Sequence, residues 1–264
     1  MLMEWGVTRT TIGAVTISSA AINDAVGWIL LASVAATVRT GFDAWDTVQM
    51  VGLTLAFGAV MYFGARPILR WWLTRTLRER NGQLGATPLA LVLALLFGCA
   101  IATNLIGIFA IFGAFVLGAV LSEQTEFREA ISRQLHDFVT AFFMPIFFTY
   151  TGLRTEITSL ETTELWLICG LVITIAIVGK FVGCGVAAWL SGFPKREAAL
   201  IGTLMNTRGL MELIVINAGY DLGVIPRSVF CMLVLMALVT TVMTTPLVMR
   251  LMPGTELEQH IRKK

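Results

Sequence analysis

The sequence predicts an all-α polytopic membrane protein with about eight transmembrane helices. Of its 264 residues, 56% are hydrophobic and 14% are charged, and the mean hydropathy is +0.80. A soluble domain of this length needs more charged surface than that. Apolar runs of about 20 residues, the length of a helix that crosses a bilayer, recur along the whole chain. Transmembrane strands fit poorly, because the runs are too long and lack strict alternation.

The predicted spans follow the apolar runs in order. They cover residues 10–38, 47–71, 87–102, 105–122, 138–154, 164–190, 197–219 and 227–250. Asn104 divides the third span from the fourth, and polar residues at 206–209 interrupt the seventh near its start. Unwound backbone occurs at membrane depth only where it lines a cavity or is buried in protein, so the interruption predicts a discontinuous helix. The alternative is that these polar residues lie at the cytoplasmic mouth of an ordinary span.

Lysine and arginine gather between the spans on one side. The segment "ARPILRWWLTRTLRERNGQLGA" carries five arginines, and the turn "GFPKRE" and the tail "EQHIRKK" fall on the same side if the spans alternate. These arginines are Arg66, Arg70, Arg75, Arg78 and Arg80. Loops rich in lysine and arginine stay on the cytoplasmic side, so we expect both termini in the cytoplasm. We expect the membrane to be a bacterial inner (plasma) membrane. The charged stretch "SEQTEFREAISRQLHD" is expected to be a solvated amphipathic loop, and the alternative is a cytoplasmic connector between core helices.

Several classes of function find no support in the sequence. The net charge of +2 follows from membrane topology, and no basic stripe with interleaved aromatics predicts a nucleic-acid partner. The four cysteines lack C-x-x-C spacing and the two histidines are isolated, so neither a disulfide framework nor a metal site is predicted. Motifs for phosphate-loop, zinc-protease or serine-hydrolase chemistry are absent, as are the paired carboxylates of intramembrane proteases. We therefore expect no enzyme, no catalytic residue and no cofactor.

Asp24 is the most informative residue within the predicted spans. It lies near the middle of the first span, where an ionised side chain costs roughly 2.5–3.5 kcal/mol and needs a partner or water. A desolvated carboxylate can hold either a proton or a monovalent cation, and the two then compete for one negative charge. Asn23 adds an amide that hydrogen-bonds without titrating. The alternative is a carboxylate that only ties the helix to a neighbour.

Two further charged groups lie inside predicted spans. Lys180 is about ten residues from the nearer end of its span, which makes escape to the interface awkward, and a moving carboxylate partner could couple its charge to transport. Arg208 and Glu212 lie one helical turn apart and belong to the interrupted segment with Asn206 and Thr207. That pair could equally be an ion pair that only fixes helix packing.

Four stretches, in this order, carry a family resemblance: "AAINDAVGWILLA", "FGAFVLGAVLSE", "FFMPIFFTYTGLRTEI" and "MNTRGLMELIVINAGYDLGVI". They resemble the monovalent cation/proton antiporter superfamily, in particular its Kef-type and plant cation/H⁺ exchanger branch. The resemblance implies a homodimeric transporter with an ion-binding core domain, a dimerisation domain and an inverted-repeat fold that works by alternating access. It maps the family's acidic pair onto Asn23 and Asp24, and its basic core residue onto Lys180.

The resemblance also implies helices before the Asp-bearing span. We therefore expect one exchanger domain over residues 1–264, truncated at its N-terminus relative to the family and without a soluble regulatory domain. The predicted function is exchange of Na⁺ or K⁺ for H⁺, with Asp24 and Asn23 binding the ion or proton. Lys180 would compensate charge, and the segment containing Asn206, Thr207, Arg208 and Glu212 would form the crossover. The alternative is a non-transporting fragment or a regulatory membrane partner of a full-length antiporter.

Overall fold

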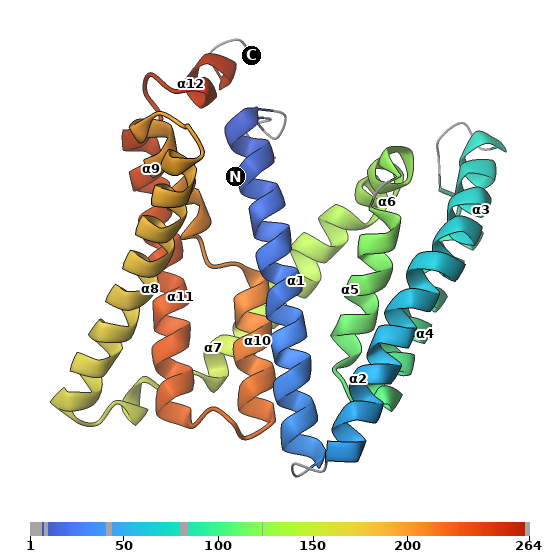
Figure 1. Ribbon diagram of the computed structural model, residues 1–264, viewed down its shortest axis with the longest axis horizontal. Helices are drawn as coiled ribbons and strands as arrows, with labels where there is room; N and C mark the ends of the chain where they lie inside the picture. Colours follow the sequence, from blue (N-terminus) through green and yellow to red (C-terminus); the bar gives the residue numbers. More distant parts are fainter. Residues whose placement is uncertain (1–6, 8–9, 41–43, 80–83, 123, 262–264) are drawn as a thin grey trace. The chain divides into compact units, whose positions relative to one another are not determined.

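The structure is a computed structural model that describes residues 7, 10–40, 44–79, 84–122 and 124–261 (Figure 1). The described residues form helices joined by short connections, with no strand among them. The helices pack into two compact units: Met1–Gly27 together with Thr151–Lys264, and Trp28–Tyr150. The long helix α1 (Thr11–Thr40) contributes residues to both units.

The unit Trp28–Tyr150 is built on one long helical element that changes pitch along its length. This element runs through α2 (Ala44–Ala59), the π-helical turn η1 (Val60–Ala65) and α3 (Arg66–Glu79). It is followed by α4 (Ala86–Ile106), α5 (Ala110–Leu121), α6 (Thr125–Phe138), a second π-helical turn η2 (Val139–Phe143) and the first part of α7 (Met144–Arg154), whose residues from Thr151 onward belong to the other unit. Its core is apolar, with Leu73 and Leu77 of α3 in one cluster with Leu117 of α5 and Phe127 of α6.

Both π-helical turns end two residues before a proline. Pro67 follows η1 and Pro145 follows η2 at that spacing. Because proline has no amide hydrogen and its ring collides with the carbonyl four residues earlier, an uninterrupted α-helix would be broken at these positions. Widening the preceding turn accommodates the proline and keeps the chain helical.

The unit containing Thr151–Lys264 is built around α8 (Thr163–Leu190), which packs against α9 (Lys195–Met205) and α11 (Arg227–Leu251) (Figure 1). Its other helices are η3 (Ile157–Ser159), α10 (Leu210–Asp221) and α12 (Glu256–Ile261). Thr10 caps α1 by accepting the amide hydrogen of Gly13 at 3.0 Å, and Glu256 accepts that of Thr11 at 3.0 Å. Both contacts satisfy amide groups in the first turn of α1, and the one to Glu256 attaches the start of α1 to α12.

Helices occupy all eight predicted segments, which confirms the all-helical class. Among the described residues, five helical segments are long and apolar enough to cross a membrane, and α5 is apolar but shorter. These five are Val48–Leu77, Ala86–Ile106, Thr163–Leu190, Lys195–Asp221 and Arg227–Leu251. The count of eight spans and the inverted repeat therefore stay predictions.

Two connecting segments differ from expectation. The charged stretch expected as a loop contains the helix α6, whose buried Phe127 and Ala130 lie three residues apart on one face. This spacing gives the helix an apolar side that packs into its unit, while its charged side chains lie outside. The arginine-rich segment after the second predicted span is also helical, as α3, through Glu79.

Candidate functional site

The predicted interruption of the seventh span is present as a break between α9 and α10. Helix α9 ends at Met205 and α10 begins at Leu210. The break is anchored to the next helix, because the hydroxyl of Thr241 in α11 donates a hydrogen bond to the carbonyl oxygen of Arg208 at 2.8 Å. One backbone carbonyl released at the break thus finds a partner on a neighbouring helix.

A charged network surrounds the start of α10. Lys180 of α8 donates a hydrogen bond to Glu212 at 3.0 Å, and the Arg208 guanidinium lies 3.6 Å from the same carboxylate oxygen. The second oxygen of Glu212 accepts the amide hydrogen of Gly209 at 2.8 Å and so caps α10. The three charged side chains are only 15–22% exposed. The Arg208–Glu212 ion pair exists, but Lys180 is the closer partner of the carboxylate.

Asp24 belongs to the same unit and lies within electrostatic range of this network. Its half-buried carboxylate interacts electrostatically with both Glu212 and Lys180. Three elements that are distant in the sequence, α1, α8 and α10, therefore bring two carboxylates and a lysine together. Asn23 and Thr207 have exposed side chains.

Asn206 at the break has an unusual environment. Its side chain is 1% exposed, and neither its amide nitrogen nor its amide oxygen has a hydrogen-bond partner among the described residues. Burial of an amide without partners costs free energy, so native proteins rarely tolerate it without water, an ion or another group. The Nε of Arg208 is also buried without a partner in the described part of the chain. The break therefore presents polar atoms that are available to a ligand.

A second polar cluster, which the sequence analysis missed, lies within the unit that contains Thr151–Lys264 and joins the last residues of α7 to α10. Arg154 forms an ion pair with Asp221 and donates to the Asn217 side-chain oxygen at 3.2 Å. The Asn217 amide nitrogen donates to Thr151 at 3.0 Å and to the Leu213 carbonyl at 2.9 Å. The residues belong to the two motifs "GLRTEI" and "INAGYD", but neither motif predicts that it contacts the other. The satisfied amide of Asn217 contrasts with that of Asn206.

No group of three or more metal-ligating side chains is found among the described residues. Cys169 and Cys231 are buried and reduced in the same apolar cluster, while Cys99 and Cys184 are half-buried thiols. Oxygen atoms of Asp24, Glu212 and Asn206 are the kind of ligand that alkali cations accept.

The fold and this cluster define a helical integral membrane protein with ionisable side chains inside its spans and a discontinuous helix beside them. The chain belongs to the sodium/hydrogen exchanger family, because the family model described as "Sodium/hydrogen exchanger, transmembrane" matches residues 1–250.

Relatives of this chain carry antiporter names. The chain is 37% identical over 256 residues to the Na(+)/H(+) antiporter NhaS4 of Synechocystis, an alignment that covers 96% of this chain and 61% of that protein. It is 37% identical over 256 residues to cation/H(+) antiporter 20 of Arabidopsis thaliana, covering 94% of this chain and 30% of the relative. It is 33% identical over 256 residues to K(+)/H(+) antiporter 1 of Saccharomyces cerevisiae, and that alignment covers 97% of this chain and 29% of the yeast protein.

These matches agree with the predicted plant and Kef-type branch and with the expectation of a transporter rather than an enzyme. The chain spans about three fifths of the cyanobacterial relative and less than a third of the plant and yeast relatives.

Proposed function

We propose that this chain exchanges a monovalent cation, Na⁺ or K⁺, for a proton, with Asp24 as the group that binds one or the other. The observation that carries the proposal is the convergence of Asp24, Lys180 and Glu212 from three helices in one unit. Relatives named as Na⁺/H⁺ and K⁺/H⁺ antiporters support the same activity.

The roles of the charged groups follow from their contacts. Glu212 already accepts hydrogen bonds from Lys180 and Gly209, so its charge is balanced within the protein. Asp24 has no ion-pair partner within 4.0 Å among the described residues, so its charge is the one left for a mobile ligand. A desolvated carboxylate binds a proton or a cation but not both, which is the competition that antiport requires. Lys180 would compensate charge beside it, and Asn23 would hydrogen-bond near the bound ion.

The break at residues 206–209 would serve as the crossover segment. Discontinuous helices in transporters expose backbone and side-chain dipoles to ions near the membrane midplane. The buried amide of Asn206 and the carboxylate of Glu212 lie at this break, on either side of Thr207 and Arg208. We propose that the site opens alternately to the two sides of the membrane as parts of a homodimer move. We also propose that this membrane is a bacterial inner membrane and that both termini face the cytoplasm.

The test is cation-induced dequenching of a pH-sensitive dye in proteoliposomes that contain this chain. Na⁺ and K⁺ are added separately to vesicles whose interior is more acidic than the external buffer. We expect dequenching with at least one cation, and its loss in the Asp24→Asn variant, which keeps the shape of the side chain but removes its charge.

The matched control is Asp221→Asn. Asp221 is a carboxylate of the same unit that pairs with Arg154 instead of facing Lys180. We expect this variant to retain cation-dependent dequenching. If the unaltered chain gives no dequenching, or if Asp24→Asn is as active as the unaltered chain, Asp24 is not the exchange site.

A further inference from the structure

A groove lies between α8 and α9 in the unit that contains Thr151–Lys264, and none of its lining residues belongs to the proposed exchange site. It has a volume of about 400 Å³, which lies in the range of small-ligand pockets. The lining residues recur at the spacing of one helix face on each side. They are Phe181, Val182, Gly185, Val186 and Trp189 of α8, and Lys195, Ala198 and Ala199 of α9.

Small residues let the two helices approach closely along this groove. A Cβ placed on Gly185 would lie 3.5 Å from the carbonyl oxygen of Ala198, so no side chain larger than a methyl group separates the backbones there. The bulkier side chains of Val182, Val186 and Trp189 flank this contact and are 44–51% exposed. The helices therefore leave a furrow with an apolar lining that stays open on one side.

The one charged residue among the described lining residues is Lys195, and it lies at one end of the groove. A connection of only four residues joins α8 to α9, so Lys195 and Trp189 lie beside this turn, whereas Phe181 and Val182 lie about two helical turns away from it. The Lys195 side chain is exposed, and it has no salt bridge among the described residues. The groove thus combines an apolar body with a positive charge at its end.

The neighbouring charges of α9 lie outside the groove. Arg196 extends toward Gly254, where a Cβ would lie 3.6 Å from its Nη1 atom. Glu197 is half-buried and accepts the amide hydrogen of Glu256 at 3.4 Å. Neither residue lines the groove, so Lys195 sets the charge at its end.

The depth of this end in the membrane follows from the two spans that the turn joins. The segments Thr163–Leu190 and Lys195–Asp221 are both long and apolar enough to cross a bilayer, so the short connection between them lies near a membrane surface. Tryptophan is enriched at that level, and lysine extends toward the headgroups. Trp189 and Lys195 therefore mark the headgroup end of the groove, and its other end lies at the depth of the acyl chains.

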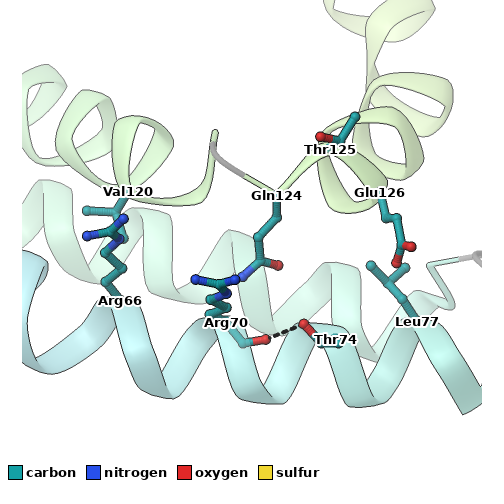
Figure 2. A pocket seen from close by; sticks show the side chains of 8 residues that line it. All are labelled: Arg66, Arg70, Thr74, Leu77, Val120, Gln124, Thr125 and Glu126. Atoms are coloured by element: carbon teal, nitrogen blue, oxygen red, sulfur yellow. Dashed lines mark hydrogen bonds between the residues drawn. The ribbon is translucent and has the colours of Figure 1, made fainter.

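A pocket of similar volume, about 390 Å³, lies in the unit Trp28–Tyr150 and has a different lining. Figure 2 shows polar side chains on both of its walls, from α3 and from residues 124–126. These polar residues are Arg66, Arg70, Thr74, Gln124, Thr125 and Glu126. An acyl chain there would displace water from polar groups, which costs free energy. The apolar lining, and not the volume, therefore distinguishes the groove between α8 and α9.

This distribution of apolar surface and charge fits an amphipathic molecule with an acyl chain and an acidic headgroup. The chain would lie against Phe181, Val182 and Val186, and the phosphate would meet the ammonium group of Lys195, which binds phosphate as a compact charge. We propose that the groove between α8 and α9 binds a phospholipid with an anionic headgroup.

The experiment measures thermal unfolding of the full chain purified in neutral detergent. Three additions are compared: phosphatidylglycerol, phosphatidylcholine with the same acyl chains, and inorganic phosphate. A ligand that binds only the folded chain raises Tm in a saturable manner. We expect this effect from phosphatidylglycerol at a half-maximal concentration about five-fold lower than that of phosphatidylcholine, and no effect from inorganic phosphate, which lacks the chains.

The first variant removes the charge. In Lys195→Gln, which alters an exposed side chain, the half-maximal concentration of phosphatidylglycerol should rise about five-fold, to that of phosphatidylcholine. The matched control is Arg196→Gln, because Arg196 is the adjacent exposed cation and does not line the groove. We expect that control to stay within about two-fold of the unaltered chain.

The second variant fills the groove and leaves its charge in place. Ala199 is a half-buried lining residue, so the larger side chain of Ala199→Leu would occupy space that the acyl chain needs. We expect this variant to weaken the response to both lipids.

The proposal is overturned if phosphatidylglycerol raises Tm no more effectively than phosphatidylcholine, because the groove then does not select an anionic headgroup. It is also overturned if Arg196→Gln weakens the effect as much as Lys195→Gln does, or if Ala199→Leu responds to both lipids as the unaltered chain does. Dequenching activity is a separate readout, so failure here leaves the proposed exchange at Asp24 untouched.

Discussion

At the residue scale, Glu212 is the centre of the charged network. It contacts Lys180, Arg208 and the amide of Gly209, whereas Lys180 contacts Glu212 as its one salt-bridge partner among the described residues. Removal of one member of a buried pair leaves the other charge uncompensated. The loss of stability should therefore be larger when the carboxylate is removed, because two cations then lose their partner, than when the lysine is removed.

The first prediction compares Glu212→Gln with Lys180→Met in thermal unfolding. We expect both to lower stability, by roughly 1–3 kcal/mol, with the larger loss for Glu212→Gln because its two cations and the α10 cap are all affected. The double variant should be less destabilised than the sum of the single variants, since neither charge is left alone. Additive losses would show that the 3.0 Å contact contributes nothing to the fold.

The second prediction contrasts two buried asparagines. Asn217 satisfies its amide through Thr151, Leu213 and Arg154, whereas Asn206 has no partner among the described residues. Asn217→Leu should therefore cost about 1–3 kcal/mol in unfolding free energy, while Asn206→Leu should be neutral or stabilising. In the dequenching assay, by contrast, Asn206→Leu should lose exchange although its stability is not lowered. Equal destabilisation by both substitutions would mean that the Asn206 amide has a structural partner.

At the element scale, the α8–α9 contact depends on two glycines. A Cβ placed on Gly202 would lie 2.4 Å from the carbonyl oxygen of Phe181 and 3.2 Å from the amide nitrogen of Gly185. Small residues that allow backbones to approach closely are the usual basis of helix packing in membranes. This contact holds α9, and therefore the break that follows it, against the helix that carries Lys180.

The third prediction is that Gly202→Ala lowers both stability and exchange. The helix backbones must separate to admit the methyl group, which we expect to cost about 1–3 kcal/mol, and the separation carries Lys180 away from Glu212. The matched control is Gly183→Ala in α8, where no atom lies within 4 Å of the added methyl group. That variant should be neutral or slightly stabilising in thermal unfolding. Equal effects of the two substitutions would contradict the close approach at Gly202.

Helix positions were predictable because apolar length alone decides them in a membrane protein. The break at residues 206–209 was also visible, because four consecutive residues there do not suit an apolar span. The ion pair between Lys180 and Glu212 could not be predicted from the sequence. The spacing of one helical turn pointed to Arg208 as the partner of Glu212, and the sequence contains no information on how α8 packs against α10. For the same reason, Arg154 and Asp221 were not recognised as partners. The helix α6 was missed because charged residues outnumber the apolar ones that give it a packed face.

At the scale of the whole molecule, the charge of the proposed exchange site constrains the stoichiometry that we expect of it. With Asp24 ionised, Asp24 and Glu212 balance Lys180 and Arg208. A proton on Asp24 or a monovalent cation beside it each leaves one net positive charge. As long as Lys180 stays paired with Glu212, the site carries the same charge in both loaded states.

The fourth prediction is therefore electroneutral exchange of one cation for one proton. Net charge movement would generate a potential that opposes further transport by about 2.3 kcal/mol per charge per 100 mV. Proteoliposomes are assayed for Na⁺- or K⁺-induced dequenching with and without thiocyanate, a permeant anion that dissipates such a potential. Electroneutral exchange should proceed at the same rate, within about two-fold, in both conditions. Several-fold acceleration by thiocyanate would contradict this charge balance, because the two loaded states of the site would then differ in net charge.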